Sequence, residues 1–238
     1  MTRTPPMLPP GTRPLSKLPD FDPRQVPVAG HDAHLPAVPA PLLAPSAIRQ
    51  RFAAPPHWEP ELWAEPAFAG RQPSLASVLV PVVMRERPAV LLTERTMGLT
   101  THSGQIAFPG GKQDDTDADA TETALREAEE EIGLDRHLTE VIGAMPTYTT
   151  VTRFVVTPVV ALVDPGYRLR INAGEVADAF EVPLDFLMNP AHHRRHVIEV
   201  DGVRREWFSM PYQDERAERF IWGATAAMLR NFYRFLSA

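Results

Sequence analysis

Cysteine is absent from the 238 residues of this chain. Its absence excludes disulfide bonds, thiolate zinc sites and cysteine nucleophiles, and it agrees with a reducing cytoplasm. Basic residues are outnumbered, since 24 Lys and Arg stand against 30 Asp and Glu and give a formal net charge of −6. An acidic chain repels phosphate backbones and anionic lipids at long range, so we expect no general binding to nucleic acid or to a membrane surface.

Long apolar runs are also missing. The longest mostly apolar stretch, residues 154–163, is far shorter than a bilayer span requires. Residues 1–18 lack the apolar stretch of a secretory signal. We therefore expect a soluble, cytoplasmic protein. The sequence alone does not indicate an oligomeric state.

Proline is concentrated near the N-terminus, where 15 of the 26 prolines lie between residues 5 and 60. Proline has no N–H donor and restricts the residue before it, so this region cannot sustain helices or inner strands. We interpret residues 1–45 as a flexible or extended arm and residues 46–238 as the folded domain. The arm's composition also permits recognition as an extended peptide, without naming a partner.

The rest of the chain alternates strands and helices. Strands are expected at residues 76–84, 89–93, 105–108, 139–144, 154–163, 197–200 and 204–208, and helices at residues 46–52, 119–132 and 221–236. The dipeptide Asp201-Gly202 favours a tight turn between the last two strands. This mixture predicts an α+β fold, an α/β/α sandwich with a mixed β-sheet.

An acidic helix is the most informative segment. Asp119 is a suitable N-cap and Gly133 a suitable C-terminal stop. Glu127, Glu130 and Glu131 have the spacing i, i+3, i+4, which places them on one arc beside an apolar stripe. Each like-charge pair costs roughly 0.2–0.5 kcal/mol on an exposed helix. A divalent cation would remove that cost, although a solvated acidic face is the alternative.

A double glycine, Gly110-Gly111, precedes this helix by a short loop. Glycine lets the backbone approach a metal or phosphate closely, and its carbonyl can bind a cation. The sequence Lys112-Gln113 does not continue as a Walker loop would. A strand, two glycines, a loop and an acidic helix together indicate a metal–phosphate site.

The stretch Arg126-Glu127-Ala128-Glu129-Glu130-Glu131-Ile132-Gly133-Leu134 resembles the second half of the Nudix hydrolase box. In the first half, five residues lead from Gly111 to Asp117 rather than to Glu, and eight residues instead of seven separate Asp117 from Arg126. This longer spacing, together with residues 91–95 and 102–111, is similar to the coenzyme A pyrophosphatase branch. The chain departs from that branch at Thr100, where a basic residue is usual, and at Thr96, where Ser or Ala is usual.

The resemblance implies a Nudix-type sandwich and an Mg²⁺- or Mn²⁺-dependent hydrolase that cleaves the diphosphate linkage of a small nucleotide substrate. On the branch's pattern, coenzyme A or an acyl-CoA would give 4′-phosphopantetheine and adenosine 3′,5′-bisphosphate. Hydrolysis of ADP-ribose or another dinucleotide-type substrate stays open, and the missing basic residue at Thr100 favours it. A non-catalytic, ligand-binding regulator is a further alternative, although the chain keeps all three glutamates of the box.

The expected metal ligands are Glu127 and Glu131, which lie one helical turn apart, with Glu130 binding a second ion or acting through water. The carbonyl of Gly110 or Gly111 is a further candidate ligand. The resemblance implies that Arg126 orients the glutamates by ion pairing. The general base is left open between Glu130, Glu175 and acidification of water by the metal itself.

The candidates for substrate binding are polar groups near the glycine pair and two arginines. Arg95 and Arg153 could bind phosphates, since arginine offers bidentate donors, but each could equally be a structural ion-pair partner. The residues that could line the site are Gln105, His102 and Gly110, and the aromatic candidates, which could instead be core residues, are Phe208, Tyr212 and Trp222. We interpret the run His192 to His196 as a solvated basic loop.

Overall fold

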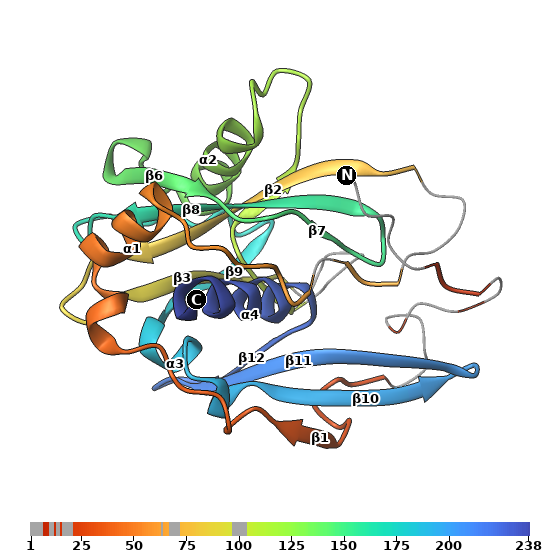
Figure 1. Cartoon of the computed structure of the whole chain (residues 1–238). Coiled ribbons are helices and arrows are strands. Elements are labelled where there is room, and N and C mark those ends of the chain that lie inside the picture. The colour runs from red at the N-terminus through yellow and green to blue at the C-terminus, as the bar shows by residue number, and fades with distance from the viewer. Residues whose placement is uncertain are drawn as a thin grey trace.

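The structure is a computed structural model that describes residues 7–9, 12, 15, 21–62, 64–66, 72–96 and 104–238. Four layers follow one another: helix α2, a large mixed sheet, helix α4 and a smaller antiparallel sheet (Figure 1). The first three layers form the expected α/β/α sandwich, so the predicted α+β fold class is confirmed. The small sheet covers the side of α4 that faces away from the large sheet.

The large sheet has the strand order β4-β3-β2-β8-β6, with β5 paired to β2, β7 to β8 and β9 to β3. Its strands are β2 (Ser74–Val83), β3 (Ala89–Arg95), β4 (Ile106–Ala107), β5 (Gly110–Lys112), β6 (Thr139–Ala144), β7 (Tyr148–Thr149), β8 (Phe154–Val163) and β9 (Val176–Pro183). β2 and β8 run parallel, whereas the other pairs are antiparallel, which makes the sheet mixed.

The small sheet has the order β1-β10-β11-β12 and is antiparallel throughout. Its strands are β1 (Val28–His31), β10 (Arg194–Val200), β11 (Val203–Gln213) and β12 (Glu218–Trp222). The α-helices are α1 (Pro45–Ala53), α2 (Ala120–Ile132), α3 (Leu184–Leu187) and α4 (Gly223–Ser237), and short 3-10 helices occur at Ala40–Leu43, Arg136–Leu138 and Pro190–His192. No helix in these described ranges is long and apolar enough to cross a bilayer.

Alternation along the central strands of the large sheet divides the core in two. Leu79 and Leu91 point toward α2 and pack with Ile132, whereas Val80 and Leu92 point toward α4 and pack with Phe232. Because both faces of these strands are covered, their sequences are almost continuously apolar. The α4 side of the core is the larger, since α4, α1 and the small sheet all contribute to it.

The N-terminal region differs from the expected arm where the structure describes it. Strand β1 pairs with β10, and Val38 and Leu43 belong to the α4 side of the core. The region has no inner strand among its described residues, since β1 is an edge strand, but it does form the short 3-10 helix Ala40–Leu43, and its backbone carbonyls and apolar side chains pack on the domain. Tyr233 of α4, for example, donates from its hydroxyl to the carbonyl of Pro36 at 2.9 Å. Residues 21–45 therefore lie against the domain.

The run His192 to His196, expected to be a solvated loop, instead enters strand β10, and His193 and His196 are buried. The His193 Nε2–H donates to the carbonyl of Leu187 at 2.8 Å, and Nδ1 accepts from Arg230 Nη1 at 3.1 Å. A neutral imidazole with both nitrogens satisfied can be buried at little cost, which explains the difference. Sequence composition alone does not reveal these partners.

Candidate active site

Helix α2 is fixed at both ends as its sequence predicts. The Asp119 side chain accepts hydrogen bonds from the backbone N–H groups of Thr121 and Glu122 at 2.8 and 2.9 Å. Gly133 adopts a left-handed conformation with φ 65° and ends the helix. Ala128 and Ile132 are buried against the large sheet. This anchoring sets the rotation of the helix, and hence the direction of its glutamates.

Glu131 is the most buried of these glutamates, with 2% of its surface exposed. Its Oε2 accepts from the backbone N–H of Gly110 at 3.1 Å, and its Oε1 lies 3.4 Å from Nη1 of Arg95. Burial raises the pKa of Glu131 to about 7, against the lowering effects of the Gly110 hydrogen bond and the Arg95 charge. The negative charges of Glu127 and Glu175 raise the pKa further. A cation bound nearby would stabilise the ionised form of Glu131, which burial and the neighbouring carboxylates disfavour.

Glu127 lies directly beside the second glycine of the pair. A Cβ atom at Gly111 would come within 2.5 Å of Oε1 of Glu127, so a residue with a side chain would displace the carboxylate. Burial also raises the pKa of Glu127, although Arg126 counteracts it. The two glycines therefore bring the backbone of β5 into contact with the carboxylates of both Glu127 and Glu131.

Arg126 is the centre of an ion-pair network. It donates to both carboxylate oxygens of Asp117 at 2.8 and 2.9 Å, and through Nη1 to Glu127 and Glu130, each at 3.0 Å. It also donates to the carbonyl of Lys112 at 3.2 Å, next to the glycine pair. The Arg126 hydrogen bonds hold the pKa of Asp117 well below its usual range. Arg126 therefore contacts two of the three box glutamates, Glu127 and Glu130, and its role in orienting them for hydrolysis stays a prediction.

Asp117 is a residue of this site that sequence reasoning did not assign a role. It replaces the expected Glu at a spacing one residue longer, and the structure shows it paired with Arg126 in a bidentate manner. The hydroxyl of Thr123 and the backbone N–H of Asp114 also donate to it, each at 2.9 Å. The altered spacing was the available signal, but the pairing depends on how the loop folds back on α2.

The donor set suits a hard divalent cation, because carboxylate and carbonyl oxygens are the ligands that Mg²⁺ and Mn²⁺ prefer. Among the described residues, however, no three acidic or histidine side chains are grouped closely enough to hold one ion together. The reason is that Arg126 draws Glu127 and Glu130 toward itself, while Glu131 bonds to Gly110. Glu130 is 59% exposed at its side chain and can turn. These carboxylates therefore suit a divalent ion, but Arg126 competes with the ion for Glu127 and Glu130.

Glu175 lies close enough to the α2 glutamates for its charge to affect them. It precedes β9, and its charge raises the pKa of both Glu127 and Glu131. Its own Oε1 accepts from Asn172 Nδ2 at 3.3 Å. The same loop caps the end of α2, since the backbone N–H of Asn172 donates to the carbonyl of Glu131 at 2.9 Å. Glu175 is a candidate base from the sequence alone, but no sequence pattern indicates the contact between Asn172 and the end of α2.

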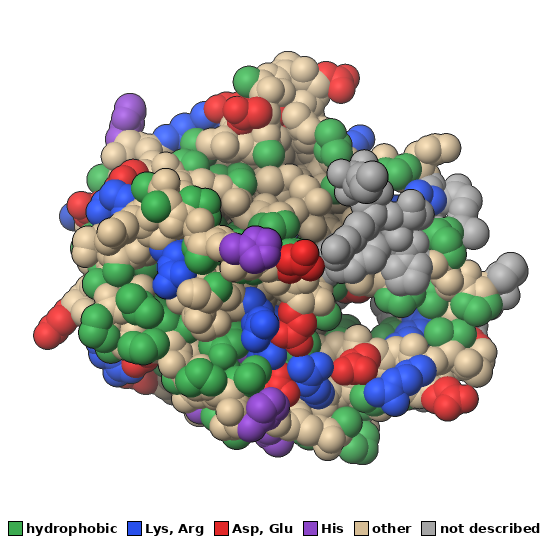
Figure 2. All heavy atoms as spheres, viewed as in Figure 1, with side chains coloured by type: hydrophobic (Ala, Val, Ile, Leu, Met, Phe, Trp, Pro, Cys, Tyr) green, Lys and Arg blue, Asp and Glu red, His purple; other side chains and the backbone are tan. Residues whose placement is uncertain are grey.

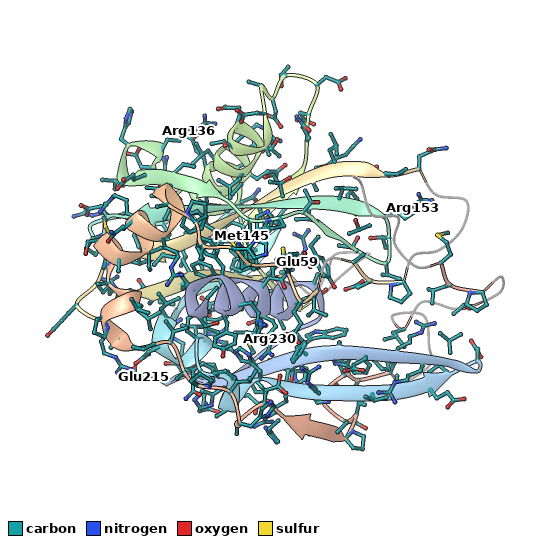
Figure 3. All side chains as sticks on the ribbon, in the orientation of Figure 1. Glu59, Arg136, Met145, Arg153, Glu215 and Arg230 are labelled. Carbon is teal, nitrogen blue, oxygen red and sulfur yellow. The ribbon has the colours of Figure 1, made fainter. Side chains whose placement is uncertain are left out.

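Of the remaining polar sequence candidates, the structure describes Gln105 and Arg153. Gln105 accepts through its carbonyl from the N–H of Arg95 at 3.1 Å, and its side chain lies beside Gly223 at the start of α4. Arg153 lies at the β7–β8 turn, away from α2 in Figure 3, and its described bonds are backbone bonds to Thr150 and Ser74. Its left-handed φ of 67° is uncommon for a residue other than glycine. His102 falls outside the described residues.

The aromatic candidates Phe208, Tyr212 and Trp222 belong to the small sheet. Phe208 is buried in the α4 side of the core, with Tyr212 packed against that core. Trp222 lies 6.2 Å from Trp207, measured between ring centroids, in an edge-on contact. Packing within the protein therefore accounts for Phe208 and Tyr212.

Comparisons with a family model and with curated proteins both point to the same family. A family model for the NUDIX domain matches residues 73–209. The chain is 42% identical over 156 residues to the uncharacterized Nudix hydrolase NudL of Escherichia coli strain K12, across 65% of this chain and 79% of that protein. NudL of Shigella boydii serotype 18 is 41% identical over the same shares.

Solved structures show a partial likeness. An Ap4A hydrolase of C. elegans in a binary complex is 17% identical, with a TM-score of 0.41 over 50% of this chain and 85% of that one. The NUDIX domain of Shewanella oneidensis NrtR, complexed with ADP ribose, is 20% identical, with a TM-score of 0.38 over 57% and 82%.

Proposed function

Because this chain belongs to the Nudix hydrolase family and hydrolyses pyrophosphate bonds, we propose that its substrate is coenzyme A or an acyl-CoA. Coenzyme A would give 4′-phosphopantetheine and adenosine 3′,5′-bisphosphate, and an acyl-CoA would give the S-acylated phosphopantetheine with the same nucleotide. The activating ion would be Mg²⁺ or Mn²⁺. The observation that carries the reaction is the contact of Glu127 and Glu131 with the Gly110-Gly111 backbone. The branch-like spacing around Asp117 and residues 91–95 and 102–111 support the substrate.

Glu127 and Glu131 act as the metal ligands in this proposal, and the carbonyl of Gly110 or Gly111 as a further one. A bound divalent ion would neutralise phosphoryl charge and lower the pKa of a coordinated water. Arg126 restricts the rotamers of Glu127 and Glu130 through its pairing with Asp117. Arg95, 26% exposed at its side chain and next to Glu131, would donate to a substrate phosphate in this proposal.

The general base is Glu130 in this proposal. Its side chain is the most exposed of the three box glutamates, so it can leave Arg126 and accept a proton from the attacking water. Glu175 is the second candidate, because its charge is felt by both metal-binding glutamates. Changing each to Gln separates the two, since loss of the base lowers kcat more than it raises KM.

The full-length protein should be incubated with coenzyme A and Mg²⁺ or Mn²⁺, and its products identified by mass spectrometry. We expect 4′-phosphopantetheine and adenosine 3′,5′-bisphosphate in equal amounts. Oxidised coenzyme A, an acyl-CoA, ADP-ribose and a dinucleotide should be compared as substrates. The proposal fails if coenzyme A and acyl-CoA stay intact while ADP-ribose or the dinucleotide is hydrolysed.

Hydrolysis of ADP-ribose or a dinucleotide remains the second candidate, because Thr100 stands where the coenzyme A branch usually has a basic residue. A basic side chain there would offer a partner for an additional phosphate, and its absence removes one such contact. Titrating coenzyme A and dephospho-coenzyme A side by side measures that contact. Equal kcat/KM values would indicate that the 3′-phosphate is not recognised.

A further inference from the structure

A buried arginine joins the small sheet to the strands that carry the site. Arg219 of β12 has 4% of its surface exposed. It pairs with Asp214 at 2.5 Å, with Asp178 of β9 at 2.6 Å and with Glu94 of β3 at 2.8 Å. Its guanidinium also lies over the ring of Phe180 at 4.2 Å. One side chain of the small sheet thus contacts two neighbouring strands of the large sheet.

Two of its partners would repel each other without it. Glu94 and Asp178 are direct cross-strand partners in the antiparallel β3–β9 pair. Like charges directly opposite one another destabilise strand pairing. Arg219 donates to both, through Nη1 to Glu94 and through Nη2 to Asp178, so it turns a repulsive pair into a bridged one. The guanidinium therefore stabilises strand pairing at this position, and the other basic partner of Asp178, the exposed Arg216, is farther away at 3.8 Å.

The bridged pair stands immediately before a break in the register. Glu94 pairs with Asp178, but the next residue, Arg95, pairs with Val176, so β9 contains one extra residue in a β-bulge. The bulge changes the face to which β9 points. Asp178 turns toward Arg219, whereas Val176 is buried on the α2 side of the sheet. Strict alternation would have given Val176 the same face as Asp178.

On the far side of the bulge, the end of β3 and the segment just before β9 each carry a residue of the candidate active site. Arg95 reaches Glu131, and Glu175 precedes Val176. The backbones remain joined here, since the N–H of Thr96 donates to the carbonyl of Glu175 at 3.0 Å. The position of both residues relative to the α2 glutamates is thus set by where the bulge occurs.

We propose that Arg219 is a positioning residue for hydrolysis: by bridging Glu94 and Asp178 it fixes the bulge that holds Arg95 and Glu175 against the α2 glutamates. The proposal rests on the proposed function, because it assigns the arginine a role through residues of that same site. Arg219 itself lies on the opposite side of the large sheet from the α2 glutamates, where its guanidinium covers the ring of Phe180. Shifts near 1 Å at a catalytic site can cost ~100-fold in rate, so the bulge position matters.

The test compares Arg219→Met with Arg230→Met. Arg230 is a matched control, because it is also buried, with 1% of its surface exposed, and pairs with two carboxylates, Asp32 at 3.0 Å and Glu61 at 2.8 Å. It lies between α4 and the small sheet (Figure 3). We expect Arg219→Met to lower kcat/KM by about tenfold or more at temperatures where it stays folded. Arg230→Met should lower the melting temperature while keeping kcat/KM within about twofold of wild type.

Hydrogen exchange provides a readout independent of metal and substrate. Peptides covering residues 93–96 and 174–179 should exchange about tenfold faster in Arg219→Met, because the strand pairing loosens there. In Arg230→Met the same peptides should keep their wild-type protection. If Arg219→Met does not fold, Arg219→Lys takes its place, which keeps the charge but loses the fork that spans both carboxylates.

A double-mutant cycle shows whether Arg219→Met lowers kcat/KM by displacing Arg95. In an Arg95→Met background, Arg219→Met should cause a markedly smaller further loss of kcat/KM than in wild type. Unchanged exchange at both peptides, or additive losses of kcat/KM, overturns the proposal. A wild-type protein that hydrolyses no diphosphate substrate contradicts the proposed function instead, and the exchange experiment then still tests the bulge.

Discussion

Acid should destabilise this protein through His193, which is fully buried beneath α4. Burial lowers the pKa of His193 to about 4 from its ordinary value of 6.5, and the charge of Arg230 lowers it as well. Leu187 accepts from Nε2, while Arg230 occupies the acceptor lone pair of Nδ1. A proton on Nδ1 would therefore face an arginine N–H inside the core.

The linkage between proton binding and folding gives the direction and the size of the change in the free energy of unfolding. Between pH 6.5 and pH 4 the unfolded chain binds the proton and the folded protein does not, so stability decreases as the pH falls through this window. The two pKa values give a loss of roughly 2 kcal/mol at pH 5 and about 3 kcal/mol below pH 4. The neighbouring charges are those of Arg230, Asp32 and His192, and the Asp32 charge opposes the other two.

Urea unfolding at pH 8, 7, 6 and 5 measures this contribution, with His193→Gln as the reference. Glutamine can donate to the Leu187 carbonyl and accept from Arg230 but does not titrate. The free energy of unfolding of wild type should fall by roughly 2 kcal/mol more than that of the variant between pH 8 and pH 5. Parallel pH profiles for the two proteins would refute the reasoning.

The other predictions concern the candidate active site and share an assay of kcat/KM with a melting curve as control. Gly111→Ala should lower kcat/KM by roughly 100-fold, because the new Cβ displaces the Glu127 carboxylate; wild-type activity would show that Glu127 has another placement. Glu131→Gln should lose Mn²⁺ binding, measured by titration, while its melting temperature stays at or above that of wild type, since a buried charge is removed. Asp117→Asn should lower kcat about tenfold by releasing Arg126, and a variant with unchanged kcat would mean that Glu127 and Glu130 alone keep Arg126 in place.

Short sequence patterns correctly predicted the features that depend on residues close together in the chain. The cap at Asp119, the stop at Gly133 and the buried stripe of α2 are all present, because capping and periodicity act within a few residues. The strands at residues 139–144 and 154–163 also have the predicted bounds. β12 was missed because Ile221 and Trp222 were assigned to the helix that begins at Gly223. A strand that leads directly into a helix has no break in its apolar pattern.

Tertiary contacts account for most of the rest. The three-residue strand β5 contains both glycines, and pairing with β2 alone makes it a strand. Strand β9 includes a bulge, so its alternation is interrupted where a strand pattern would be sought. Ion pairs such as Arg219 with Glu94 join residues 125 positions apart, and no short window of sequence contains both.

The charged layer between α4 and the small sheet has a practical consequence for shortening the chain. Figure 2 shows acidic and basic side chains side by side on the surface of this part of the molecule. Asp32, which is buried, accepts from both Arg195 and Arg230. A protein cut at the proline-rich boundary near residue 45 would keep both arginines but discard Asp32. Glu61 would still pair with both arginines, but the buried Arg230 would lose one of its two carboxylate partners, which lowers stability. Trimming for crystallisation or expression should therefore stop before residue 21.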